Sequence, residues 1–156
     1  MLQLGVKMRF ILIAMIVFGC SQQESVEVPR FSGVKAFQYL EKQCEFGPRN
    51  PGSTGHKEFA NYLENFLKER SDNILIQEFE YIEPVTESLR KGKNFIVQFN
   101  QDAKYRLLIG AHWDTRAISD QDKNIEHKTL PVLGANDGGS GTAILMTLYD
   151  MFTADE

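Results

Sequence analysis

Apolar residues recur with a helical period in three parts of the chain. A first helix is predicted from Ser32, its expected N-cap, with apolar positions at Val34, Phe37, Tyr39, Leu40 and Cys44. A second helix is predicted over residues 53–70, with one apolar stripe at Phe59, Tyr62, Leu63, Phe66 and Leu67. A third is predicted over residues 138–152, with core candidates at Ala143, Leu145, Met146, Tyr149 and Phe152.

Three further segments have the pattern of β-strands. They are ILIQEFEYI at residues 74–82, KNFIVQFN at 93–100 and YRLLIGAH at 105–112. The last is nearly continuous in apolar residues, which predicts a central strand buried on both faces. FGPRNPGSTG separates the first two helices, and a long loop spans residues 113–135. The pattern predicts an α/β domain whose sheet is thin, and the chain is therefore expected to be truncated.

The first twenty residues form a separate unit. Lys7 and Arg9 precede FILIAMIVFG, an apolar stretch well short of the roughly 20 residues that a membrane-spanning helix needs. This predicts a secretory signal over residues 1–20, starting at Met1 or Met8. A tether over residues 21–31 and a domain over residues 32–156 follow.

The end of that signal, VFGC, resembles a bacterial lipobox, in which cleavage leaves Cys20 as a lipidated N-terminus. The resemblance implies a lipid-anchored protein of the bacterial cell envelope, and Ser21 favours the outer membrane. A plain secretory signal that contains a cysteine is the alternative. The only other cysteine is Cys44, for which we predict a buried, unpaired side chain, because a disulfide with Cys20 would join a tether to a helix end.

Composition excludes few functions. Of the 156 residues, 42% are hydrophobic and 24% are charged, which is enough apolar material for one domain core. The net charge is −4 and the Lys and Arg residues are scattered, so the basic face that nucleic-acid binding requires is not predicted.

Two segments could carry chemistry. His112 and Asp114 are two residues apart at the end of a predicted strand, so both side chains can point to one side. A carboxylate there can hold one imidazole nitrogen and turn the other toward a metal. The second segment is GANDGGSG at residues 134–141, where Asp137 lies in a glycine-rich bend before a helix and is either a functional residue or a helix cap.

Several common motifs are absent from these segments. Ile144 stands where a dinucleotide fingerprint needs its third glycine, and Ser140 stands where a P-loop needs lysine. The loop from Asp120 resembles the start of an EF-hand, but Ile125 and Pro131 occupy its turn-glycine and glutamate positions. The serine-hydrolase pattern G-x-S-x-G is absent too.

Taken together, YRLLIGAHWDTR and the later LPVLGANDGGSGTAILM resemble the zinc aminopeptidase and glutaminyl-peptide cyclotransferase superfamily. FGPRNPGSTGHKEFANYLENFL is similar to its N-terminal segment. The resemblance implies an α/β fold with a mixed sheet flanked by helices and zinc at the strand ends. It implies that Asp137 binds zinc in both branches, that His112 is a ligand only in a two-zinc site, and that Asp114 orients His112.

The same resemblance implies an acid/base glutamate, an adjacent carboxylate ligand and a late histidine ligand well downstream, beyond Glu156. The chain is therefore expected to be an N-terminal fragment that is inactive or nearly so. His56 is expected to be structural, and nothing about the setting of His127 recommends it as a substitute ligand. Trp113 either lines the substrate pocket or belongs to the core.

AHWDTR followed by the aspartate-rich loop at residues 119–122 is similar to bacterial members of the cyclotransferase branch. The resemblance implies a one-zinc enzyme that converts the N-terminal glutamine of peptides or proteins to pyroglutamate and releases ammonia. The alternative is a two-zinc aminopeptidase that removes N-terminal residues. A second alternative is an inactive fragment or a lipid-anchored binding domain.

Overall fold

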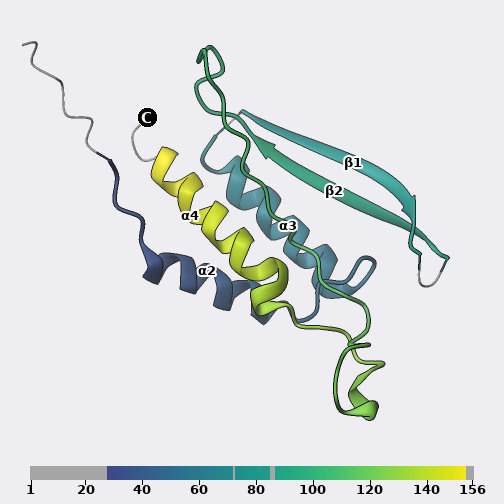
Figure 1. Cartoon of the computed structure of the whole chain (residues 1–156). Coiled ribbons are helices and arrows are strands. Elements are labelled where there is room, and N and C mark those ends of the chain that lie inside the picture. Colours follow the sequence, from purple (N-terminus) through teal and green to yellow (C-terminus); the bar gives the residue numbers. More distant parts are fainter. Residues whose placement is uncertain (1–27, 72, 85–86, 154–156) are drawn as a thin grey trace, which may run out of the picture.

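The computed structural model describes residues 28–71, 73–84 and 87–153 (Figure 1). The predicted signal at residues 1–20, Cys20, Ser21 and the tether up to residue 27 lie outside the described residues. Along the chain the elements are α2 (Gly33–Glu45), α3 (Thr54–Lys68), β1 (Ile74–Ile82), β2 (Leu89–Val97), the short turn η1 (Ile125–His127), the bend η2 (Ala135–Ser140) and α4 (Gly141–Thr153).

The three predicted helices form, and serine side chains begin two of them. Ser32 Oγ accepts a hydrogen bond from the amide of Lys35 at 3.2 Å at the start of α2, as predicted. Ser53 Oγ accepts one from the amide of His56 at 3.1 Å at the start of α3. Both bonds satisfy an amide that has no partner within the helix.

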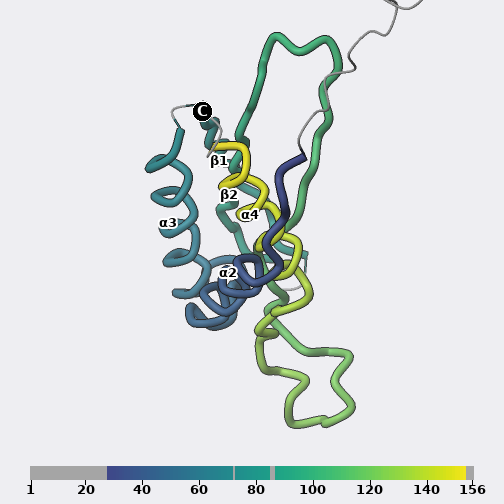
Figure 2. The backbone as a smooth tube through the Cα atoms, turned by 90° about the vertical axis from the view of Figure 1, so that its left-hand side faces the viewer, coloured from purple at the N-terminus to yellow at the C-terminus, as the bar shows by residue number. Residues whose placement is uncertain are grey.

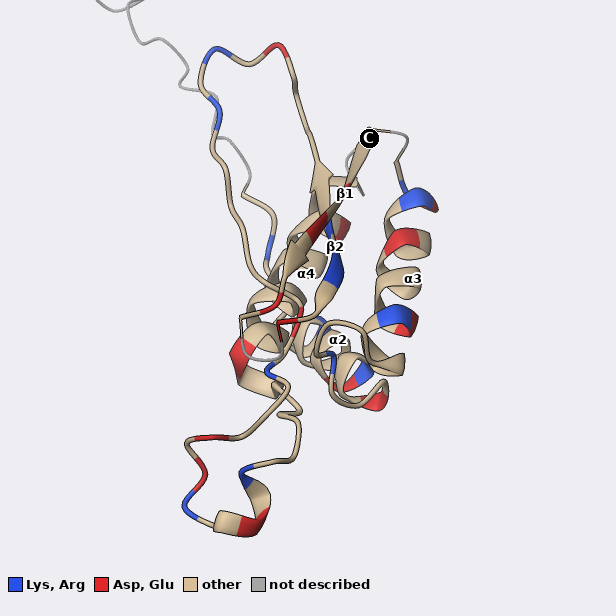
Figure 3. Ribbon diagram, turned by 90° about the vertical axis from the view of Figure 1, so that its right-hand side faces the viewer, with Lys and Arg blue, Asp and Glu red and all other residues tan. Residues whose placement is uncertain are grey.

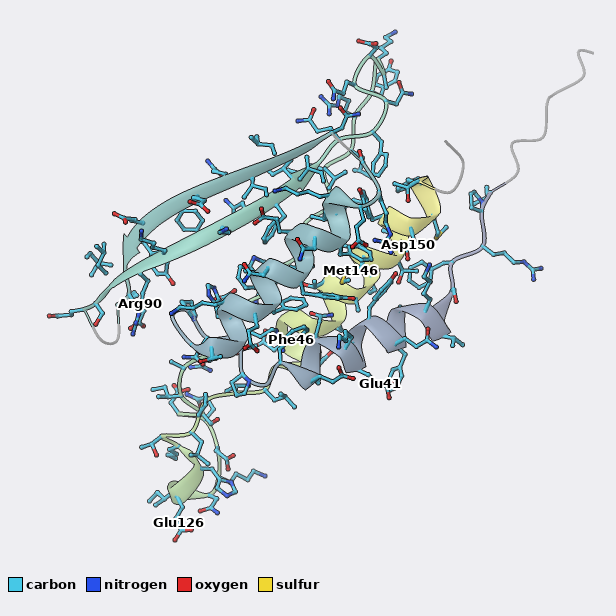
Figure 4. The ribbon with its side chains drawn as sticks, turned by 180° about the vertical axis from the view of Figure 1, so that it is seen from behind. Glu41, Phe46, Arg90, Glu126, Met146 and Asp150 are labelled. Carbon is cyan, nitrogen blue, oxygen red and sulfur yellow. The ribbon has the colours of Figure 1, made fainter. Side chains whose placement is uncertain are left out.

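The core lies between α3 and α4. Its buried members are Phe59, Leu63, Phe66, Leu67, Met146 and Tyr149. Met146 is labelled in Figure 4, where its side chain lies between the two helices. The hydroxyl of Tyr149 donates a hydrogen bond to the carbonyl of Leu67 at 2.8 Å, which satisfies a buried polar group of this core.

One predicted core position is wrong, because Phe152 of α4 is 47% exposed. The apolar positions Val34 and Phe37 of α2 are likewise 73% and 58% exposed. The helix period identifies an apolar face, but burial also requires an element that covers the face. α2 contacts α4 and the bend η2 through another side, which buries Gln43.

β1 and β2 form an antiparallel hairpin that runs from the pair Ile74 and Val97 to the pair Ile82 and Leu89. The second strand thus begins four residues earlier than the predicted 93–100 and ends at Val97, because its limits are those of its ladder with β1. Phe95 and Val97 pack against the helical core, so the hairpin covers the α3 side of the molecule (Figure 1). The predicted α/β class is confirmed.

The predicted central strand at residues 105–112 is not formed. The segment has no β-ladder with any described residue, and Leu107, Leu108 and Ile109 are 85%, 90% and 53% exposed. An apolar run becomes a strand only when a neighbour accepts its backbone hydrogen bonds, and β1 and β2 bond only to each other in the described sheet.

Two loops leave the body in opposite directions in Figure 2, one between β2 and the segment near residue 105 and the other within residues 116–133. Lys and Arg are interspersed with Asp and Glu along α3 and the hairpin (Figure 3). No helix in the described part of the chain combines the length and apolar character needed to cross a bilayer.

Candidate metal centre

The segment that carries His112 and Asp114 is held from two sides. Thr142, in the first turn of α4, donates a hydrogen bond to the carbonyl of His112 at 3.0 Å. On the other side, Thr115 Oγ1 accepts a bond from the amide of Arg49 at 2.8 Å, and the amide of Thr115 donates to the carbonyl of Arg49 at 3.3 Å. These contacts hold residues 112–115 next to the N-terminal end of α4, although the segment is not part of the described β-sheet.

Asp137 is presented by a tight bend before α4. Gly134 and Gly138 have φ values of +66° and +86°, which favour glycine, and Asp137 between them is non-helical at φ −78° and ψ 104°. The amide of Gly139 closes the bend by donating to the carbonyl of Gly134 at 3.1 Å. As a result, Asp137 Oδ1 lies 3.1 Å from His112 Nε2.

The other nitrogen of His112 faces Asp114. His112 Nδ1 lies 3.1 Å from the main-chain carbonyl of Asp114 and 3.4 Å from its Oδ1. The Asp114 carbonyl and the Asp137 carboxylate can both only accept, so each ring nitrogen faces an acceptor. When Nε2 binds a metal ion, the Asp114 carbonyl holds the remaining proton on Nδ1. His112 and Asp114 therefore lie together, as predicted. The main-chain oxygen of Asp114 is nearer to His112 Nδ1 than its carboxylate oxygen is. The side chains of His112, Asp114 and Asp137 are 56%, 46% and 63% exposed, so the group is open to solvent.

The His112 and Asp137 pair suits zinc. Imidazole nitrogen and carboxylate oxygen are common zinc ligands at about 2.0–2.2 Å, and two ligands on one tetrahedral ion are then roughly 3.3 Å apart. The observed separation of 3.1 Å fits this spacing. A catalytic zinc takes three protein ligands, and within the described ranges no three His, Cys, Asp or Glu side chains are grouped to hold one ion. In the described residues the pair therefore supplies fewer ligands than a catalytic zinc site needs.

The other two histidines lie in different settings. His56 is 8% exposed and stacks on Trp113 with ring centroids 4.4 Å apart, which agrees with a structural role. Burial lowers the pKa of His56 below its ordinary value, so it packs as a neutral ring at pH 7. His127 is in η1, where its Nδ1 lies 3.6 Å from Asp122 Oδ2. Figure 4 labels its neighbour Glu126 at the far end of the projecting loop.

Trp113 belongs to the core. Its indole N–H donates to the carbonyl of Lys93 at 3.1 Å, and its ring centroid lies 6.1 Å and 6.0 Å from those of Phe59 and Phe95. Trp113 therefore joins the segment 112–115 to α3 and β2. Cys44 is a half-buried free thiol, which corrects the prediction that its side chain is buried.

Two buried polar side chains beneath the bend were missed by the sequence analysis. Gln43 and Arg49 are both 0% exposed. Arg49 lies in the Pro- and Gly-rich segment between α2 and α3, and a charged residue in such a segment is ordinarily solvated. Carbonyl groups of residues 113 and 133–134, which are distant in sequence, meet those of Gln43 and Gly47 around it and explain its burial.

Comparison with known proteins gives the same family as the sequence motifs. Residues 94–156 match peptidase family M28. The comparison with curated proteins gave no significant match.

Three solved bacterial structures share the fold at 32% sequence identity. The glutaminyl cyclase of Tannerella forsythia has a TM-score of 0.76 over 81% of this chain and 43% of its own length. A leucine aminopeptidase precursor from Bacteroides thetaiotaomicron has 0.79 over 85% and 45%. A Zn-dependent exopeptidase from Parabacteroides distasonis has 0.77 over 82% and 44%. The chain thus spans less than half the length of each. These likenesses confirm the predicted resemblance: the chain is similar to bacterial glutaminyl cyclases and Zn-dependent exopeptidases, and its residues 94–156 match peptidase family M28.

Proposed function

We propose that this chain contributes part of the zinc site of a glutaminyl-peptide cyclotransferase, which acts on peptides or proteins with N-terminal glutamine. The contact of His112 Nε2 with Asp137 Oδ1 at 3.1 Å, where the bend enters α4, carries the proposal. The likeness to a structure named as a glutaminyl cyclase and the AHWDTR motif with its aspartate-rich loop support this branch.

In this reaction the α-amine of the substrate attacks the carbonyl carbon of its own glutamine side chain. The C–N bond to the amide nitrogen breaks, a proton passes from the amine to that nitrogen, and ammonia leaves. Asp137 would hold the ion in this proposal, and Asp114 would fix the His112 ring through Nδ1. A bound zinc ion supplies Lewis-acid polarisation of the side-chain carbonyl. One ion suffices here, and Nε2 of His112 would then carry a proton and donate it to Asp137 Oδ1, which orients that carboxylate.

A second candidate is a two-zinc aminopeptidase, in which water attacks the first peptide bond. The likeness to the leucine aminopeptidase precursor supports it. In this case His112 is itself a ligand, because its Nε2 and Asp137 Oδ1 have the spacing of two ligands on one ion. The two proposals therefore differ in the role of His112 and in the number of ions.

Mass analysis of two peptides separates the candidates. Incubation of the full-length protein with Gln- and Leu-initiated peptides is expected to show loss of ammonia from the first peptide only, whereas release of free leucine indicates the aminopeptidase. Asp137→Ala is expected to abolish both the activity and zinc retention after dialysis. The matched control is Asp102→Ala, which removes an exposed loop carboxylate. Zinc content in Asp137→Ala equal to that of the control would refute the proposed site.

We also propose that Cys20 is lipidated and anchors the protein in the bacterial envelope, at the outer membrane. The support is the VFGC motif after a short apolar segment. In cells fed labelled palmitate, the protein should carry label and sediment with outer-membrane vesicles, and Cys20→Ser should do neither. Equal membrane association of both forms contradicts the proposal.

A further inference from the structure

We propose that Arg49 is the positioning residue of the metal centre: its buried guanidinium ties the His112–Asp114 segment to the bend that carries Asp137. The inference rests on the proposed function, because it concerns the same pair of residues, His112 and Asp137. It adds a residue from outside both site segments and assigns it a measurable effect on zinc affinity.

The hydrogen bonds of Arg49 join three parts of the chain. Its Nε donates to the carbonyl of Trp113 at 3.1 Å, between His112 and Asp114. Its Nη2 donates to the carbonyl of Gly134 at 3.1 Å, and its Nη1 to that of Leu133 at 3.2 Å, both at the start of the bend. Its Nη1 also lies 3.3 Å and 3.4 Å from the carbonyls of Gln43 and Gly47 near the end of α2.

The acceptors of this guanidinium explain why it can be buried. Arg49 is 0% exposed, and burial lowers its pKa, although the group stays charged at neutral pH. A charge taken out of water needs several hydrogen bonds to remain ionised. Here the acceptors are main-chain carbonyls, whose positions depend on the path of the chain. The guanidinium therefore favours one arrangement of the two segments over others.

Gln43 strengthens the same connection from α2. Its Nε2 donates to the carbonyl of Gly139 at 3.0 Å, at the far end of the bend. Gly134 and Gly139, which flank Asp137, are thus each held by a buried side chain, and their own backbone bond closes the bend between them. The side chain of Asp137 is itself 63% exposed. Its position therefore depends on the hydrogen bonds that hold the backbone of Gly134 and Gly139.

The geometry tells positioning apart from general stabilisation. The guanidinium forms no hydrogen bond with His112 or Asp137. It donates instead to the carbonyl of Trp113, next to His112, and to the carbonyls of residues 133–134, which precede Asp137. Loss of the guanidinium should therefore separate His112 from Asp137 more than it loosens the core between α3 and α4. Residues that support metal ligands without binding the metal typically change metal affinity by about 10–100-fold.

The test compares Arg49→Met, Arg49→Lys and Leu63→Ala in the full chain. Methionine keeps apolar bulk without donors, and lysine keeps the charge without the planar fork. Leu63→Ala removes packing from the core and leaves the bend untouched. The measurements are zinc affinity by competition with a chelating dye, and amide hydrogen exchange at Thr115 and Gly139.

We expect Arg49→Met to weaken zinc binding about 10–100-fold and to speed exchange at Thr115 and Gly139 more than at core amides of α3. Arg49→Lys should recover part of both effects, and Leu63→Ala should change mainly the core amides. If Arg49→Met does not fold, Gln43→Met gives the same comparison by removing one donor to Gly139.

The outcomes separate the two proposals. If Asp137→Ala binds zinc as the unmodified chain does, the proposed metal site is wrong. If Asp137→Ala loses zinc while Arg49→Met keeps its affinity and its exchange pattern, only the positioning role is overturned. Equal acceleration of exchange throughout the Arg49→Met protein also overturns it, because that result indicates general destabilisation.

Discussion

The replacement of Gly138 by alanine tests whether the bend sets the contact between His112 and Asp137. Gly138 has φ +86°, a conformation that residues with a Cβ rarely adopt. A Cβ there would lie 2.8 Å from the carbonyl oxygen of Asp114, 3.0 Å from His112 Cε1 and 3.1 Å from His112 Nδ1. The added methyl group thus meets a main-chain atom and the imidazole ring together.

The expected effect has two parts. The strained backbone costs about 1–3 kcal/mol. At about 2–4 °C per kcal/mol for a chain of this size, the Tm should fall by roughly 2–12 °C. The imidazole must also turn away from the Asp114 carbonyl, so the zinc affinity should fall by about 10-fold or more.

Calorimetry and a zinc competition titration measure the two parts separately. Gly110→Ala is the matched control: Gly110 lies two residues before His112, has no positive φ, and an added Cβ meets nothing within 4 Å. The control should change the Tm and zinc affinity little. If Gly138→Ala matches the control in both measurements, the bend does not position the pair as the structure indicates.

The remaining predictions concern stability and association. Burial raises the pKa of Asp150, but hydrogen bonds from Lys35 and Tyr39 and the charges of Lys35 and Arg70 outweigh it and leave the pKa below its usual value. The resulting stability is present above about pH 4 and is lost as the pH falls through the folded-state pKa, so Asp150→Asn should cost about 1–2 kcal/mol at pH 7 and less at pH 3 by urea unfolding. A constant difference between these pH values would contradict this assignment. Leu108 is 90% exposed in an unpaired extended segment, and Leu108→Lys should therefore reduce self-association in sedimentation experiments. Val34→Lys, on α2, should leave self-association unchanged.

The sequence alone determined the helices and the identity of the site segments. The serine caps and the apolar stripe of α3 depend on residues within one or two helical turns, so local spacing predicts them. The glycine-rich bend is equally local, because only glycine adopts the backbone angles at positions 134 and 138 readily. The bend identifies Asp137, whereas His112 and Asp114 follow from their two-residue spacing after an apolar run.

The tertiary structure decided which segments have partners. The apolar run at residues 105–112 reads as a central strand, but a strand also requires a neighbour to accept its hydrogen bonds, and the described chain gives it none. Arg49 shows the converse. Its charge predicts exposure, yet it is buried because carbonyl oxygens from positions 113, 133 and 134 converge on it. Such convergence depends on residues more than sixty positions away, and local patterns carry no information about it.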